Sequence, residues 1–146
     1  MQKIEKIKNT MKKYDIYSRS LEWENSQKEV EIDCVDWIIC NMFCAYNDNE
    51  LVSVGLVNNH YDPNDLNCAL VTIRNNPNNQ DELIINNLLK TMLEFSKNEL
   101  NAKSIVFKTK KENLVVIDQI EKDNYDFIKF DDETITFKKK LINKEV

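Results

Sequence analysis

An apolar strand, a polar loop and an amphipathic helix follow one another within Asn67–Leu100. We expect the strand at Cys68–Ile73, the loop at Arg74–Glu82 and the helix from Leu83 to near Asn98, where apolar residues recur at helical spacing. The backbone N–H groups at such a helix start lack partners within the helix, and anions often bind them. The segment therefore predicts a sheet packed against a helix, with a candidate anion site where the two meet.

The N-terminal part of the chain is predicted to be helical. Ile4, Ile7, Met11 and Tyr14 recur at helical spacing, which predicts a surface amphipathic helix over residues 1–17. The lysines between them are interpreted as a solvated face, with a membrane or acidic partner as the alternative. A second short helix is expected within residues 18–36.

Strands are expected on both sides of the central segment. Residues 36–46 are almost all apolar, which suits a central strand covered on both faces. A turn at Asn47–Asn49 and a return strand at Leu51–Val57 complete a hairpin, and a polar loop follows at Asn58–Leu66. The later elements are expected to be a strand at Ser104–Thr109, a helix at Glu112–Lys122, and strands at Tyr125–Phe130 and Thr134–Lys140.

This order of elements predicts the fold class. It indicates a mixed α/β domain of the α+β class, in which one mixed, mostly antiparallel sheet is flanked by helices. Residues 1–146 are expected to form a single domain, with an N-terminal helical part at 1–35 and the sheet core at 36–141.

Charge and hydropathy argue against some classes of function. The net charge is −5 and the pI is about 5.0, whereas nucleic-acid-binding domains usually have a basic face. No apolar run approaches the roughly 20 residues that span a bilayer, and the lysine-rich N-terminus lacks the apolar segment of a secretory signal. We therefore expect a cytoplasmic protein with no nucleic acid and no membrane partner.

The positions of the cysteines and of the single glycine predict features of their local environment. The four cysteines, Cys34, Cys40, Cys44 and Cys68, form no C-x-x-C pair and lie in apolar contexts. They are expected to be buried free thiols, with a zinc site as the alternative; we predict no metal site. The only glycine, Gly55, lies inside an expected strand, which indicates a bulge or a close backbone approach. Asparagine is abundant and can replace glycine where φ is positive.

Three stretches together resemble the GNAT superfamily of N-acetyltransferases, over roughly residues 37–141. Ala45–Gly55 resembles the family's hairpin, in which an acidic or glycine turn leads to a strand that ends in glycine. Ile73–Leu89, with Pro77 and Gln80 in the usual places, resembles the acyl-CoA loop and its helix. The late strand and closing helix of the family are matched by Ala102–Phe107, Asn113 and Ile120–Tyr125.

The resemblance implies direct transfer of an acetyl group from acetyl-CoA to an amine of a small molecule or a protein. It also implies that two neighbouring strands diverge, so that the backbone of residues 73–75 faces the pantetheine arm, which Asn113 also contacts. Asn113 is equally a good helix N-cap. The residues implied to bind the cofactor are Ile73, Asn75, Gln80, Asp81, Glu82, Leu83, Ile84, Ile85 and Asn113.

The loop departs from the family's pattern, Gln/Arg-x-x-Gly-x-Gly/Ala. Leu83 and Ile85 stand at the glycine positions, where side chains would crowd the phosphates, and Asp81 and Glu82 add two negative charges. Like charges ~4 Å apart repel by about 1 kcal/mol in water and by several times more when partly desolvated, so these carboxylates oppose a diphosphate. Helix capping by Asp81 and Glu82 is the alternative interpretation.

The catalytic groups lack a clear motif. Amine acetylation needs a base for the amine proton and an acid for the leaving thiolate. The strand before the loop has no carboxylate, so His60, Asp62 and Asp65, just upstream of it, could supply a base through water, and His60 is the candidate base. Ile120 stands where the family has its tyrosine, which leaves Tyr125 as the candidate acid if the backbone is shifted. The alternatives are an ordinary loop histidine and a core tyrosine.

Two other interpretations stay open. The missing glycines, acid and base favour a catalytically inactive GNAT-like module that binds another protein, as an immunity, antitoxin-like or regulatory protein does, and an acidic module suits a basic partner. An unrelated α+β domain with the same element order is the third interpretation. For the oligomeric state, a homodimer is only the general expectation for soluble oligomers.

Overall fold

The computed structural model describes residues 2–23, 40–60 and 67–141, which hold three helices and seven strands. In chain order the elements are β1 (Gln2–Ile7), α1 (Thr10–Leu21), β2 (Asn41–Asn47), β3 (Glu50–His60), β4 (Cys68–Asn75), α3 (Glu82–Asn98), β5 (Ser104–Lys110), α4 (Leu114–Lys122), β6 (Asp126–Asp131) and β7 (Thr134–Lys140). The expected strand–loop–helix segment is therefore present as β4, a loop and α3.

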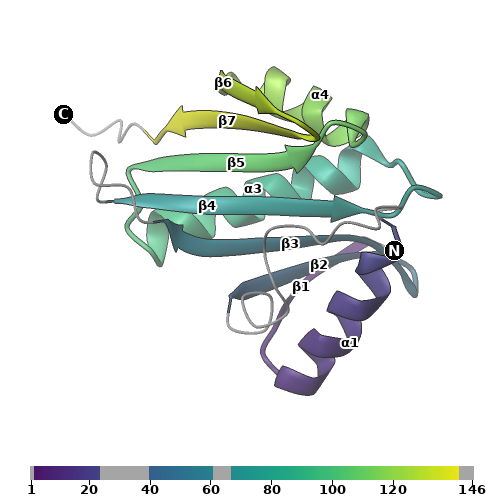
Figure 1. Ribbon diagram of the computed structural model, residues 1–146. Coiled ribbons are helices and arrows are strands. Elements are labelled where there is room, and N and C mark those ends of the chain that lie inside the picture. The colour runs from purple at the N-terminus through teal and green to yellow at the C-terminus, as the bar shows by residue number, and fades with distance from the viewer. Residues whose placement is uncertain (1, 24–39, 61–66, 142–146) are drawn as a thin grey trace.

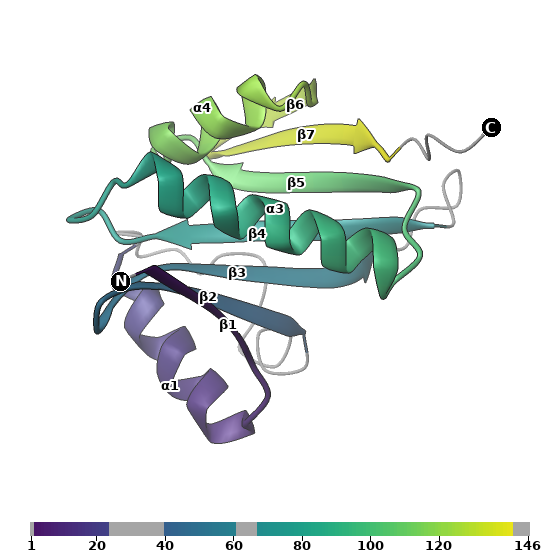
Figure 2. The same ribbon diagram turned by 180° about the vertical axis from the view of Figure 1, so that it is seen from behind.

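The seven strands form one sheet in the order β1-β2-β3-β4-β5-β7-β6. Among these strands β4 and β5 are parallel, and the other neighbours are antiparallel. Helix α1 covers one face of the sheet, while α3 and α4 cover the other (Figures 1 and 2). The predicted α+β class, with a mixed, mostly antiparallel sheet flanked by helices, is confirmed.

Two apolar clusters lie on opposite faces of the sheet, because successive side chains of a strand alternate. In β2, Met42 and Cys44 belong to the cluster under α1, and Phe43 and Ala45 belong to the cluster under α3 and α4. All four are at most 4% exposed. The strand is covered on both faces, as its apolar run predicted, and it begins at Asn41; the part of the expected strand at residues 36–39 lies outside the described residues.

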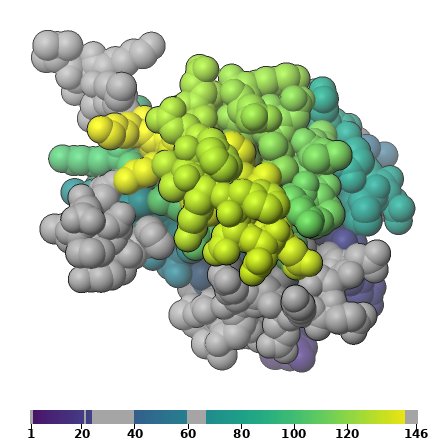
Figure 3. All heavy atoms as spheres, turned by 45° about the horizontal axis from the view of Figure 1, so that its top comes forward, coloured from purple at the N-terminus to yellow at the C-terminus, as the bar shows by residue number. Residues whose placement is uncertain are grey.

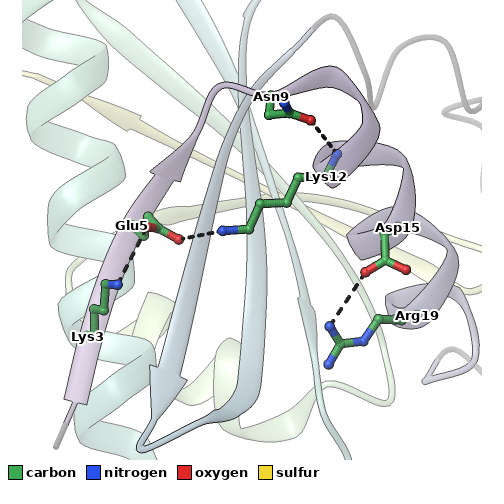
Figure 4. A network of polar contacts seen from close by, with 6 residues as sticks. All are labelled: Lys3, Glu5, Asn9, Lys12, Asp15 and Arg19. Carbon is green, nitrogen blue, oxygen red and sulfur yellow. Dashed lines mark hydrogen bonds and ion pairs between the residues drawn. The ribbon is translucent and has the colours of Figure 1, made fainter.

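The predicted N-terminal helix is wrong in its first half, which forms β1, an edge strand antiparallel to β2. Helix α1 begins after Asn9, whose side chain accepts a hydrogen bond from Lys12 N at 2.9 Å, while Glu5 and Lys12 form an ion pair at 3.2 Å (Figure 4). Ile4 and Ile7 fit a helical spacing, yet strand pairing places them in different clusters on the two faces. Tertiary pairing overrides the local pattern here, so part of the expected helical region belongs to the sheet.

Some other elements differ from the prediction in their boundaries or in their buried face. Strand β3 extends through His60 into the expected polar loop, because residues 58–60 pair with Cys68–Leu70. In α4 the buried residues include Val116 and Ile120, whereas Leu114 is 72% exposed, so the buried face is rotated from the predicted one. Most of the region expected to form a second short helix, at 18–36, lies outside the described residues, and α1 runs on to its C-terminal residue at 21.

Aspartate and asparagine make the backbone conformations that glycine usually makes. The described non-glycine residues with positive φ are Asp48 at 56°, Asn101 at 54°, Asn124 at 62° and Asp132 at 52°. Asp48 lies in the β2–β3 turn and Asp132 in the β6–β7 turn. Their short polar side chains tolerate this left-handed region, so a chain with one glycine still forms tight hairpins.

The single glycine lies in β3 beneath α3. A Cβ on Gly55 would lie 2.8 Å from the methyl carbon of Met92 and closer still to its sulfur. The close-approach interpretation is confirmed, and the irregularity in the β2–β3 pairing lies at Ala45–Tyr46 instead. Because Gly55 pairs with Ile73, this close packing holds α3 against the end of β4.

Strand β6 forms the edge of the sheet opposite β1. All six of its residues are exposed, and Figure 3 looks onto β6 and β7 (yellow-green to yellow) beside α4. The alternation predicted for β7 is confirmed: Phe137 is 3% exposed and joins the α3 cluster, while Thr136 and Lys138 point to the other face.

Candidate functional site

Strands β4 and β5 separate at their carboxyl ends. Their register runs from Cys68–Ser104 to Thr72–Lys108 and stops there. Beyond it, residues 73–75 of β4 pair with β3, and residues 109–110 of β5 pair with β7. We call these diverging ends the β4–β5 fork, and Figure 1 shows the two arrowheads moving apart. The divergence that the resemblance implied is confirmed, and it leaves backbone groups on facing edges that can bind a ligand.

Asn113 spans the fork. Its Nδ2 donates to Thr109 Oγ1 at 3.0 Å and lies 3.5 Å from the carbonyl oxygen of Ile73. Asn113 stands at the N-cap position of α4, yet its side chain makes no capping hydrogen bond. The side chain therefore makes its hydrogen bonds across the fork and does not cap α4. Sequence reasoning missed Thr109, because strand alternation alone does not tell which threonine faces a gap.

Amide side chains hold the loop between β4 and α3. Asn75 accepts a hydrogen bond from the Ser53 hydroxyl, and its Nδ2 donates to the carbonyls of Asn76 and Asn79 and to Gln80 Oε1, at 3.2–3.3 Å. Gln80 also donates to a loop carbonyl 3.3 Å away. Two side chains that were predicted to contact the cofactor thus fix the loop itself.

Asp81 caps α3. One of its carboxylate oxygens accepts hydrogen bonds from Leu83 N at 3.0 Å and Ile84 N at 3.2 Å, and its carbonyl accepts one from Ile85 N at 3.2 Å. The capping interpretation is confirmed for Asp81, and Glu82 adds a second carboxylate in the first turn. Three amides of the predicted diphosphate site are therefore bonded within the helix start, in an arrangement that the helix dipole favours.

The bulky residues at the glycine positions point in different directions. Ile85 is 0% exposed and Ile84 is 2% exposed, and both anchor α3 in the cluster beneath it. Leu83 is 60% exposed. Of the two side chains expected to crowd a phosphate, Leu83 alone stands on the solvent side of the helix start.

His60 lies at the far end of the sheet from the fork. It ends β3 and pairs with Cys68, the first residue of β4. The fork begins after Thr72, which is roughly 13 Å further along β4 at about 3.3 Å per residue. The described backbone does not bring His60 to the fork, so the geometry adds no support to its predicted role as a base.

Tyr125 packs on the α3 side of the sheet. Its ring contacts Phe107 edge-on with centroids 6.2 Å apart, and Lys139 Nζ lies 5.3 Å from the ring centroid. Burial raises the pKa of the Tyr125 phenol far above its usual value, so the phenol keeps its proton at neutral pH. The packing fits the core interpretation, and Phe107 directly precedes Lys108, the last residue of β5 that pairs with β4.

Cys40, Cys44 and Cys68 are free and buried, as predicted, while Cys34 lies outside the described residues. Burial raises the pKa of the Cys44 thiol to about 12, which keeps it protonated and unreactive. Among the residues with described positions, no group of three or more His, Cys, Asp or Glu side chains could hold a metal ion.

A cavity of about 420 Å³ lies between β1 and α3. Lys3, Tyr46, Lys90 and Glu94 are among its lining residues. Strand β1 is three places from β4 in the sheet, roughly 14 Å at about 4.8 Å per strand. The cavity is therefore not part of the fork.

No family model and no curated protein matches the sequence. Solved structures match its shape. An N-acetyltransferase from Staphylococcus aureus Mu50 has a TM-score of 0.69 at 16% identity, covering 98% of this chain and 99% of that one. An acetyltransferase of the GNAT family from Streptococcus pneumoniae has a TM-score of 0.70 at 8% identity, covering 97% and 100%. The Campylobacter jejuni N-acetyltransferase PseH, in complex with acetyl coenzyme A, has a TM-score of 0.56 at 11% identity, covering 96% and 99%.

The chain has the GNAT fold over nearly its whole length. At these identities the likeness shows the fold, and the chemistry has to be argued from the residues. In the described ranges, none of the helices has the length and apolar content that crossing a bilayer requires.

Proposed function

We propose that the protein is an N-acetyltransferase that uses acetyl-CoA and an amine acceptor. The observation that carries the proposal is the β4–β5 fork with Asn113 across it. In this proposal the backbone of residues 73–75 binds the pantetheine arm as an added strand would, and Asn113 Nδ2 exchanges its 3.5 Å hydrogen bond to the Ile73 carbonyl for one to the arm. The solved complex of PseH with acetyl coenzyme A supports the choice of cofactor.

The two ends of the cofactor fit this chain unequally. The fork offers backbone groups and a side-chain amide, which suit the amides of the pantetheine arm. The start of α3 offers amides that Asp81 already occupies, next to the second carboxylate of Glu82. We therefore propose that acetyl-CoA binds mainly through its pantetheine arm, with an affinity that the helix start weakens.

Acetyl-CoA supplies an activated thioester, and the chain's residues position the acceptor and handle protons. The acceptor nitrogen forms a bond to the acetyl carbon, the carbon–sulfur bond breaks, the nitrogen loses a proton and the thiolate gains one. Strands β4 and β5 contain no aspartate, glutamate or histidine, so we propose that the acceptor reacts as the free amine. Tyr125 is the proposed donor to the thiolate, although burial raises the pKa of its phenol and so makes it a weaker acid than an exposed tyrosine.

Ligand-dependent thermal unfolding tests the proposal. Acetyl-CoA at about 100 times its Kd raises the free energy of unfolding by about 2.7 kcal/mol, which is roughly 5–10 °C in Tm for a chain of this size. Asn113→Ala is expected to weaken binding roughly 3- to 10-fold, the worth of one lost hydrogen bond. Asn98→Ala, at the exposed end of α3, is the matched control and leaves binding unchanged.

The capped helix start specifically favours a second function, that of a catalytically inactive module which binds a protein. If the Asp81 carboxylate permanently occupies the amides that would otherwise bind the diphosphate, the fork is kept only as part of the fold. No shift in Tm at millimolar acetyl-CoA, in the native chain and in Asp81→Ala alike, would reject the transferase and favour the inactive module.

A further inference from the structure

Strands β4, β5 and β7 contain no acidic residue, although the chain has 25 acidic and 20 basic residues. Ile73, Phe107 and Phe137 point into the cluster under α3, so the residues beside them point to the opposite face. We call that face of the three strands the second face. It is only partly exposed, because Arg74 is 2% and Thr136 is 5% exposed while Thr72 and Lys108 are half-buried. Its basic residues are Arg74, Lys108, Lys110, Lys138 and Lys140.

One row of the second face combines an ammonium with two hydroxyls. Lys108 pairs with Thr72 on β4 and with Thr136 on β7, so the three side chains lie side by side. Lys108 is half-buried, and within the described part of the chain it makes no hydrogen bond or ion pair. Across β7, Lys129 of β6 also pairs with Thr136, which places a second lysine roughly 10 Å from the first, at about 4.8 Å per strand.

Two of the neighbouring cations have partners that Lys108 lacks. Lys110 lies 3.8 Å from Glu133, and Arg74 donates to Ser20 Oγ at 3.2 Å. The acidic residues of β6, at 126 and 131, pair with Lys138 and Thr134, not with the Lys108 row. A half-buried ammonium costs desolvation energy unless an anion joins it, and a carboxylate or a phosphate is the natural match.

The row borders the fork, because Thr72–Lys108 is the last pair before the strands diverge. The α3 face of the fork is filled by side chains such as Ile73, Ile85 and Phe107, all at most 1% exposed. On the second face, Thr72 and Lys108 are only half-buried at this point, so we infer that an acceptor reaching an acyl group held at the fork passes Lys108.

We propose that the acceptor is an amine that also carries a carboxylate or a phosphate, and that the half-buried Lys108, with Thr72 beside it, binds this anionic group. The inference rests on the proposed acetyl transfer and adds the class of acceptor to it.

Paired acceptors test the inference. L-Glutamate is compared with L-glutamine, and O-phosphoethanolamine with ethanolamine, with acetyl-CoA held constant. We expect the anionic member of at least one pair to have a kcat/KM roughly 10- to 100-fold higher, the worth of one charge-assisted hydrogen bond. The pair that shows this preference identifies the bound anionic group as a carboxylate or as a phosphate. Lys108→Gln should abolish the preference through KM, and Lys108→Arg should restore part of it, while Lys97→Gln, exposed on α3, leaves it unchanged.

Binding experiments separate this inference from the proposed function. Calorimetry should give the same acetyl-CoA affinity for the native chain and Lys108→Gln. Glutarate and inorganic phosphate, titrated without acetyl-CoA, should perturb amide resonances of β4, β5 and β7 in the native chain only. Equal kcat/KM for charged and neutral acceptors, or anion binding that survives Lys108→Gln, would overturn the inference even where acetyl-CoA binds. Absence of acetyl-CoA binding would instead reject the proposed transferase and leave the anion titrations to decide on the Lys108 row.

Discussion

Replacing Asp81 by alanine is expected to lower stability and to raise the affinity for acetyl-CoA at once. The carboxylate of Asp81 accepts hydrogen bonds from two amides, at 3.0 and 3.2 Å. Loss of such an N-cap costs about 1 kcal/mol, which lowers Tm by roughly 3 °C in a domain of this size.

The gain in affinity follows from the same change. Two amides become free to bind a diphosphate, and a hydrogen bond to a charged group contributes about 1.5–3 kcal/mol. Removal of the Asp81 charge also relieves a repulsion of about 1 kcal/mol at ~4 Å in water. Even if ordering the ligand offsets most of this, we expect a Kd at least tenfold lower, or about 1.4 kcal/mol.

Two matched variants separate the contributions of the cap and the charge. Asp81→Asn keeps a capping oxygen and removes the charge, so Tm should stay near the native value while Kd falls by a smaller factor. Glu82→Gln removes the neighbouring charge and leaves the cap intact. Calorimetric titration gives Kd, and unfolding without ligand gives Tm. An Asp81→Ala protein that loses stability but keeps the native Kd would show that these amides do not face the cofactor, and the reasoning about the loop would be refuted.

Three further predictions concern the core and the chemistry. Tyr125→Phe keeps the ring packed on the sheet, so kcat should fall at least tenfold while acetyl-CoA affinity stays constant; equal kcat values would return Tyr125 to a purely structural role. Gly55→Ala should destabilise the protein by about 1–3 kcal/mol in urea unfolding, and Met92→Leu in the same chain should recover part of the loss if the clash is with that side chain. The Cys44 thiol has a pKa of about 12 in the fold against an ordinary value of 9.0. Above pH 9 the unfolded chain therefore loses a proton that the native chain keeps, and stability should fall by up to about 1.4 kcal/mol per pH unit, with a smaller slope in Cys44→Ala.

Much of the fold could be predicted because its signals are local. The apolar run of β2, the alternation of β7 and the amphipathic α3 each reflect burial within one element. Strand β1 could not be recognised in the same way. Its two isoleucines are three residues apart, a spacing that fits a helix, and their placement on opposite faces depends on pairing with β2.

The same distinction, between local signals and signals that depend on tertiary structure, applies to the candidate site. Capping by Asp81 is a local property of a helix start, so the sequence already held it as an alternative. The bridge from Asn113 to the fork depends on where α4 places its first residue relative to two strands, which no spacing in the sequence encodes. The row of Thr72, Lys108 and Thr136 likewise requires the registers of β4, β5 and β7.

Different interactions hold the fork and the helix start in place. The fold can therefore be kept while the ability to bind a diphosphate changes. The fork depends on strand pairing and on the packing of α3, which belong to the fold, and the fold is shared with structures that are only 8% or 16% identical to this chain. The amides at the start of α3 need an acceptor, and an internal carboxylate or an external phosphate satisfies them equally well in geometry. They cannot bind both at once. In this chain the capping oxygen of Asp81 therefore couples the stability of α3 to the affinity for a diphosphate with opposite sign. A substitution that removes this oxygen and frees the amides, such as Asp81→Ala, weakens the helix as it strengthens diphosphate binding.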